Sequence, residues 1–149
     1  MKSFTDIEQS KKLTEILPIE SADMRWLYVT SQGKHIAMMY EEPDPHYLAR
    51  MESYGIKNAA IPCWSLAALI SILPRYLNYN DDKLRLNLYT LDFENLYRKD
   101  HCWVVGYWDY DEECEKYNFQ IEAREDEIID ACVELIENLH NKMVYDFNN

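Results

Sequence analysis

Glycine is scarce in this sequence: Gly33, Gly55 and Gly106 are the only glycines among 149 residues. Loops that hold the phosphates of nucleotides depend on closely spaced glycines, because a backbone without Cβ atoms approaches the phosphate groups closely. Neither the G-x-G-x-x-G pattern nor the G-x-x-x-x-G-K-S/T pattern occurs. The sequence therefore offers no nucleotide-binding loop of these two kinds.

Paired cysteines are also missing. The four cysteines, Cys63, Cys102, Cys114 and Cys132, lie far apart, and no C-x-x-C pair occurs. Zinc sites usually combine two closely spaced ligand pairs, and calcium loops need a glycine among spaced Asp and Asn residues. Neither pattern is present at His101-Cys102 or in the acidic run 109–114. We therefore expect no metal and no other cofactor, and we expect reduced thiols.

Positive charge and long apolar runs are lacking too. The chain has 15 Lys and Arg against 27 Asp and Glu, a net charge of -12. A surface of this sign repels phosphate backbones, so we expect no direct nucleic-acid binding. The longest apolar stretch, residues 64–73, is too short to cross a bilayer, which takes about 20 residues. Because the first residues also lack the apolar segment of a signal peptide, we expect a cytoplasmic protein without membrane contact.

The sequence does contain the balance of a globular protein, with 48% hydrophobic and 28% charged residues. No repeat or linker divides it, so we expect one domain over residues 1–149. Three helices are predicted. Residues 6–17 follow a Thr5–Glu8 capping box, residues 64–73 are apolar on all sides, and residues 128–143 carry apolar side chains at spacings of three and four.

Segments rich in β-forming residues predict the strands. Residues 24–30 and 35–40 flank a turn and predict a hairpin, whereas the stretch 46–60 is predicted mainly as loop. Residues 84–88, 102–108 and 117–122 are joined by short polar segments, which favours an antiparallel meander. The expected fold class is α+β: a small antiparallel sheet packed against the second and third helices, extended by an N-terminal helix and hairpin.

Aromatic residues are abundant, with twelve Tyr and four Trp. Because alternate residues of a strand face opposite sides, Trp103 and Tyr107 would share one face and Trp108 and Val104 the other. Some of these rings would then lie exposed beside acidic residues, as in many protein interfaces. The candidate interaction surface comprises Trp103, Tyr107, Trp108, Asp109, Tyr110 and Asp111. The alternative is that helices cover both faces of the sheet.

Cys63 is the only candidate nucleophile that the sequence singles out. It stands at the expected start of a helix, where backbone N–H groups would stabilise a thiolate. The alternative is a small buried side chain between Pro62 and Trp64. Carboxylate pairs such as Asp92 and Glu94 or Glu112 and Glu113 occur by chance in so acidic a chain. We expect no enzyme activity, and no catalytic residue is assigned.

Three stretches resemble small uncharacterised proteins encoded on phages and mobile elements of gut anaerobic bacteria. These stretches are residues 8–13 together with 17–24, then Ile61-Pro62-Cys63-Trp64-Ser65-Leu66-Ala67-Ala68-Leu69, and Asp130-Ala131-Cys132-Val133-Glu134-Leu135-Ile136. The resemblance implies a bacterial cytoplasmic setting and an accessory role, and it transfers no catalytic residue. The C-terminal half, where Phe119-Gln120-Ile121-Glu122-Ala123 leads into the last helix, is similar in outline to the phage ABA-sandwich domain, in which helices flank a small antiparallel sheet.

The leading functional expectation is a non-enzymatic interaction protein of phage or mobile-element origin with a protein partner. A second hypothesis is an acidic nucleic-acid mimic that inhibits a host DNA-binding protein; it requires carboxylates aligned in a stripe. A third is a small hydrolase that uses Cys63 or a carboxylate pair in a cleft. The oligomeric state is left open.

Overall fold

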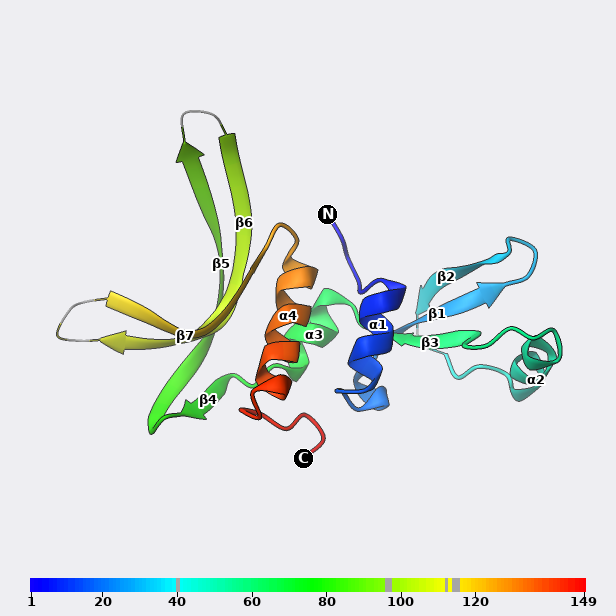
Figure 1. Ribbon diagram of the computed structural model, residues 1–149. Helices are drawn as coiled ribbons and strands as arrows, with labels where there is room; N and C mark the ends of the chain where they lie inside the picture. Colours follow the sequence, from blue (N-terminus) through cyan, green and yellow to red (C-terminus); the bar gives the residue numbers. More distant parts are fainter. Residues whose placement is uncertain (40, 96–97, 112, 114–115) are drawn as a thin grey trace.

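The computed structural model describes the backbone of residues 1–39, 41–95, 98–111, 113 and 116–149. It describes the side chains of the same residues other than 92–95, 98–100, 110–111, 116–117 and 119. The fold is α+β, with helices and two antiparallel sheets (Figure 1). The expected fold class is therefore confirmed.

The elements follow one another in an order that separates the two sheets along the chain (Figure 1). They are α1 (Ile7–Thr14), the 3-10 turn η1 (Ile19–Ser21), β1 (Met24–Val29), β2 (Lys34–Met39), α2 (Pro45–Ser53), β3 (Ala60–Cys63), α3 (Leu66–Ile72), β4 (Tyr76–Tyr79), β5 (Asp82–Asn95), β6 (Arg98–Asp111), β7 (Lys116–Glu125) and α4 (Ile128–Asn141).

The first sheet has the strand order β2-β1-β3, and both pairings are antiparallel. Its hairpin confirms the one predicted from residues 24–40, with Gly33 at a positive φ of 63° in the turn. β3 was not predicted, because Pro62 interrupts its pattern. Proline is tolerated there because β3 is an edge strand and needs no N–H on its outer side.

The second sheet has the order β4-β5-β6-β7, an antiparallel meander as predicted. The predicted strands were too short: β5 and β6 each run over 14 residues, and β4 was missed. Gly106 lies at the centre of β6, where an added Cβ would come within 2.6 Å of the Ile121 carbonyl oxygen. The close approach of β6 and β7 therefore requires glycine at this position.

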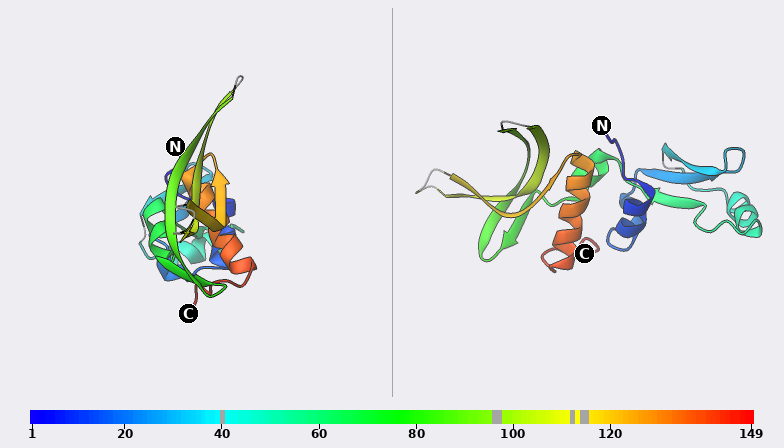
Figure 2. Two further views of the ribbon diagram at one scale, coloured as in Figure 1. Left: turned by 90° about the vertical axis from the view of Figure 1, so that its left-hand side faces the viewer. Right: turned by 45° about the horizontal axis from the view of Figure 1, so that its top comes forward.

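The helices α1, α3 and α4 lie between the two sheets, whereas α2 lies at the far end beside the first sheet (Figures 1 and 2). α4 packs on β6 and β7, α3 packs against α4, and α1 lies against β3 and touches α4. The side chains of α4 that face this core are fully buried, namely Ile129, Leu135, Ile136 and Leu139. They belong to the apolar stripe predicted for this helix. Burial of these side chains is the main apolar contribution to the stability of this region.

Three helix predictions need correction. Asp6 and Gln9, not Thr5 and Glu8, form the capping box of α1: Asp6 Oδ1 accepts from the Gln9 N–H at 2.9 Å and Gln9 Oε1 from the Asp6 N–H at 3.1 Å. The second helix begins only at Leu66 and is not buried on all sides, since Ala67 and Ser71 are exposed. It also packs mainly on α4 and not on the sheet.

The stretch 46–60, predicted mainly as loop, contains the nine-residue helix α2. Asp44 caps this helix through its side chain, and Pro45 occupies the first helical turn, where its missing N–H costs nothing. Only Met51 of α2 is buried, so the helix lacks the apolar stripe by which helices are recognised. None of the described helices is long and apolar enough to span a membrane.

Candidate functional site

The predicted interaction surface is divided between the two faces of β6. Tyr107 is fully buried, and its hydroxyl donates to the Pro74 carbonyl oxygen at 2.7 Å. Burial raises the pKa of Tyr107 well above its ordinary value. Trp103 is partly buried and packs against the same core. Because both side chains turn toward the core, the expectation that Tyr107 lies on an interaction surface is wrong.

Trp108 lies on the opposite face of β6, as the strand alternation predicted. Its ring packs edge-to-face on Tyr89, with ring centroids 5.2 Å apart, and it is half-buried. Asp109 is also half-buried. The side chains of Tyr110 and Asp111 lie outside the described residues. Within the described part of the chain, the six residues therefore do not form one continuous exposed patch.

Cys63 does not have the surroundings of a nucleophile. Its side chain is fully buried in β3, where Sγ lies 3.6 Å from the Thr5 hydroxyl and 3.5 Å from the Thr5 carbonyl oxygen. Burial raises the pKa of the Cys63 thiol, so the protonated form is favoured. Cys132 on α4 is buried as well, and its pKa is raised to about 12. Cys114 lies outside the described residues.

A row of carboxylates does follow α4, as a nucleic-acid mimic would require, but cations from the N-terminal segment face it. Glu127 and Asp130 contact this segment: the Lys2 ammonium lies 2.7 Å from Asp130, and the Lys2 backbone N–H donates to Glu127 at 3.0 Å. Lys12 lies 3.6 Å from Glu137. These contacts attach the N-terminus to α4 and place cations against part of the row.

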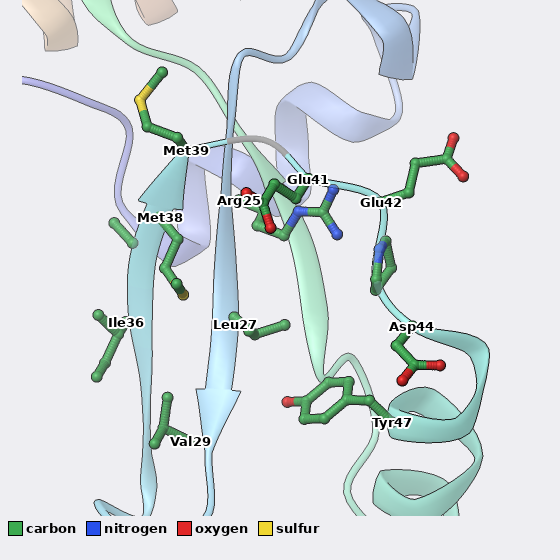
Figure 3. A pocket seen from close by; sticks show the side chains of 12 residues that line it. Arg25, Leu27, Val29, Ile36, Met38, Met39, Glu41, Glu42, Asp44 and Tyr47 are labelled. Atoms are coloured by element: carbon green, nitrogen blue, oxygen red, sulfur yellow. The ribbon is translucent and has the colours of Figure 1, made fainter.

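A cavity lies over the first sheet, on the face turned away from α1 (Figure 3). We call it the β1–β2 groove. It has a volume of about 850 Å³. Its floor consists of apolar side chains from two neighbouring strands, namely Leu27, Val29, Ile36 and Met38. These residues share one face because Leu27 pairs with Ile36 and Arg25 with Met38 across the hairpin.

The opposite face of the same hairpin is covered. There Trp26 packs edge-to-face on Phe4, and its ring N–H donates to the Thr5 carbonyl oxygen at 3.1 Å. On the same face, Cys63 and Ile61 of β3 are buried beside α1. The hairpin is thus a half-buried ribbon with one face in the protein interior and the other facing the groove.

The wall of the groove is acidic on one side. Glu41, Glu42 and Asp44 lie along the segment that leads from β2 to α2, and all three are exposed (Figure 3). Arg25, by contrast, is only 5% exposed at the end of the floor, and Figure 3 shows Glu41 beside it. The groove therefore combines an apolar floor with carboxylates on its accessible rim.

Tyr47 of α2 closes the other end of the groove. Its ring points toward Leu27 (Figure 3), and its hydroxyl donates to the Tyr28 carbonyl oxygen. Burial raises the pKa of Tyr47 above its ordinary value, which further favours the protonated hydroxyl that donates this bond. The bond fixes α2, and the acidic segment before it, against β1. The sequence analysis does not identify this site, because the segment before α2 has no periodic pattern. The Asp44-Pro45 pair, typical of a helix start, was the available signal for α2.

Among the described residues, no group of three or more His, Cys, Asp or Glu side chains gathers in a way that suits a metal ion. Comparisons with family models, with curated proteins and with solved structures gave no match to this chain. The groove geometry is therefore the main structural guide to function.

Proposed function

We propose that this protein is a non-enzymatic interaction protein that binds a basic segment with apolar side chains, supplied by a partner protein, in the β1–β2 groove. The accessory role in a phage or mobile element that the sequence resemblance implies is part of this proposal. The observation that supports it is the union of an apolar floor with the exposed carboxylates of Glu41, Glu42 and Asp44 in one cavity.

Each half of the groove selects one property of the ligand. Apolar side chains gain free energy by covering Leu27, Ile36 and Met38, which water otherwise contacts in part. Lysine or arginine side chains are attracted to the rim, and the net charge of -12 steers a basic segment toward the protein as a whole. An acidic segment would be repelled by the same field, so the charge sets specificity.

The two other hypotheses find less support in the geometry. The mimic hypothesis needs an unopposed row of carboxylates, whereas the row on α4 faces Lys2 and Lys12. The hydrolase hypothesis needs an accessible thiolate, whereas Cys63 is fully buried. The interaction hypothesis needs accessible apolar and acidic side chains close together, and the β1–β2 groove combines both.

The test uses fluorescence anisotropy with labelled model peptides of about 12 residues, a length that covers a short groove. One peptide alternates leucine and lysine, a second alternates serine and lysine, and a third alternates leucine and glutamate. We expect binding of the first only. Equal binding of the serine–lysine peptide would show that the apolar floor plays no part.

Matched protein variants separate groove binding from general attraction to an acidic protein. We expect the double variant Glu41→Lys/Glu42→Lys to lose about tenfold in affinity for the leucine–lysine peptide, or about 1.4 kcal/mol. The control Glu15→Lys/Glu20→Lys makes the same change of net charge at exposed positions away from the groove. Equal losses in the two variants would contradict the proposal.

A further inference from the structure

A second cavity lies where the end of α3, the start of β4 and the segment after α4 meet (Figure 1). We call it the β4–β5 cavity. It has a volume of about 820 Å³, and its apolar lining includes Ile72, Leu73 and Leu86. β4 has four residues whereas β5 has 14, so β4 covers only the first part of β5. The cavity opens where this cover ends.

Backbone hydrogen bonds hold the walls of the β4–β5 cavity in place. The Leu86 N–H donates to the Arg75 carbonyl oxygen at 3.0 Å, which fixes the start of β4 against β5. Tyr145 enters the lining from the C-terminal segment, where its N–H donates to the Leu139 carbonyl oxygen at 3.3 Å. A site whose walls are formed in advance costs a ligand little ordering free energy.

The β4–β5 cavity carries positive charge in a protein that is negative overall. Arg75 and Arg85 line it, and none of the described residues in its lining is Asp or Glu. Arg75 directly precedes Tyr76, which lies opposite Arg85, so both arginines stand at the same end of the strand pair. Neither guanidinium forms an ion pair with a described carboxylate. The Lys83 ammonium, 4.5 Å from the centre of the Tyr76 ring, adds a third cation beside the cavity.

The negative charges around the cavity are weaker than these cations. The end of α3 contributes about half an elementary charge through the helix dipole. Asp146 lies in the C-terminal segment, where its carboxylate accepts from the Asn148 N–H at 2.9 Å and from the Asn149 side chain at 2.5 Å. Asp82 precedes Arg85 on β5 by about 10 Å of strand, roughly one screening length in physiological salt. The cavity therefore favours an anion.

We propose that the β4–β5 cavity binds a small organic phosphate, with its dianionic phosphoryl group at Arg75 and Arg85 and its apolar body against Leu73, Leu86 and Tyr145. Guanidinium groups form paired hydrogen bonds with phosphate oxygens, and two of them match a charge of about -2. A carboxylate carries only one charge. The volume lies in the range of small-molecule pockets. This inference does not depend on the β1–β2 groove, whose carboxylates favour the opposite charge.

A titration of the full chain with phenyl phosphate, followed by NMR at constant ionic strength, tests the proposal. We expect saturable shifts of the amide signals of Leu73, Leu86 and Tyr145, with a dissociation constant on the order of 1 mM, the strength typical of so small a ligand. The signals of Leu27 and Ile36 in the β1–β2 groove should stay unchanged. No saturable shift in the β4–β5 cavity up to about 20 mM overturns the proposal.

Three related compounds separate the contributions of charge and apolar body. Inorganic phosphate keeps the charge without the ring, and benzoate keeps the ring with one negative charge. We expect each to bind about tenfold more weakly than phenyl phosphate. Benzyl alcohol keeps the ring without charge, and we expect no binding. If benzyl alcohol or benzoate binds as tightly as phenyl phosphate, the assignment to phosphate is wrong.

Matched variants locate the site. We expect Arg75→Gln and Arg85→Gln each to weaken phenyl phosphate binding at least tenfold, because each removes a charged donor. Both side chains are exposed, so the variants should fold, which circular dichroism checks. The control Arg50→Gln removes the same charge from an exposed position on α2, outside this cavity, and should leave the affinity unchanged. Equal affinities of Arg85→Gln and Arg50→Gln overturn the proposal, whatever the leucine–lysine peptide does in the β1–β2 groove.

Discussion

The four-stranded sheet turns Val105, Tyr107, Ile121 and Ala123 into a core with α4, and all four side chains are buried. The three-stranded sheet turns Leu27, Val29 and Ile36 toward a cavity, and these side chains are only half-buried. Both sheets are antiparallel and both have apolar strands, so strand composition alone does not distinguish them. Coverage of this face by a helix makes one sheet a structural core, whereas the groove face of the other sheet has no such cover and lines a cavity.

Equivalent leucine truncations in the two regions should give the largest contrast. Leu135→Ala removes a fully buried side chain of α4, and we expect it to lower the free energy of unfolding by about 4 kcal/mol. Leu27→Ala removes a half-buried side chain from the groove floor, and we expect a loss of about 1 kcal/mol. Urea denaturation followed by circular dichroism measures both. Similar losses would mean that the groove floor also contributes fully to the core.

Glycine substitutions in the two sheets give a second contrast. In Gly106→Ala the new Cβ would lie 2.6 Å from the Ile121 carbonyl oxygen and 2.9 Å from Glu122 Cβ, so β6 and β7 must separate. We expect a loss of about 3 kcal/mol. Gly33→Ala meets open space but keeps an unfavourable φ of +63°, so we expect a loss of about 1 kcal/mol. Thermal denaturation measures the two losses of stability. A larger loss for Gly33→Ala than for Gly106→Ala would contradict the close packing of β6 on β7.

Carboxylates in the two regions should respond differently to neutralisation. Burial, followed by nearby Glu125 and Glu137, raises the pKa of Glu134 on α4 above its ordinary value. A raised folded-state pKa favours folding only at low pH, and this contribution is lost as the pH rises through the folded-state value. We therefore expect Glu134→Gln to stabilise the protein by about 0.5 kcal/mol at pH 7, but not at pH 4.

The matched change in the groove is Glu42→Gln. Its side chain is exposed, so we expect no change in stability at either pH, but weaker binding of the leucine–lysine peptide. Melting temperatures at the two pH values and one anisotropy titration check both statements. A stabilisation by Glu42→Gln as large as that by Glu134→Gln would remove the distinction between the two regions.

The parts of the fold that the sequence predicts are those in which local pattern and burial agree. The apolar stripe of α4 and the alternation in β5, β6 and β7 follow directly from contact with one core. β3 and α2 were missed for opposite reasons. Pro62 normally argues against a strand but is allowed at an edge, whereas α2 buries only Met51 and therefore has almost no periodic signal.

The candidate site was harder to predict than the fold. Strand alternation correctly separated Trp103 and Tyr107 from Trp108, but alternation does not tell which face a helix covers. The β1–β2 groove depends on contacts between distant parts of the chain, such as the bond from the Tyr47 hydroxyl to the Tyr28 carbonyl oxygen. No local pattern specifies such contacts, because they arise only once α2 has folded back on the hairpin.

Pro62 also limits strand pairing at the outer margin of the first sheet. In β3, Ile61 and Cys63 lie opposite Trp26 and Met24, whose backbone groups point toward β3, so the nitrogen of Pro62 faces outward and has no hydrogen to donate. This outer margin is only four residues long and cannot accept a regular further strand. Edge-to-edge aggregation through β3, the usual hazard of an exposed strand margin, is thereby disfavoured.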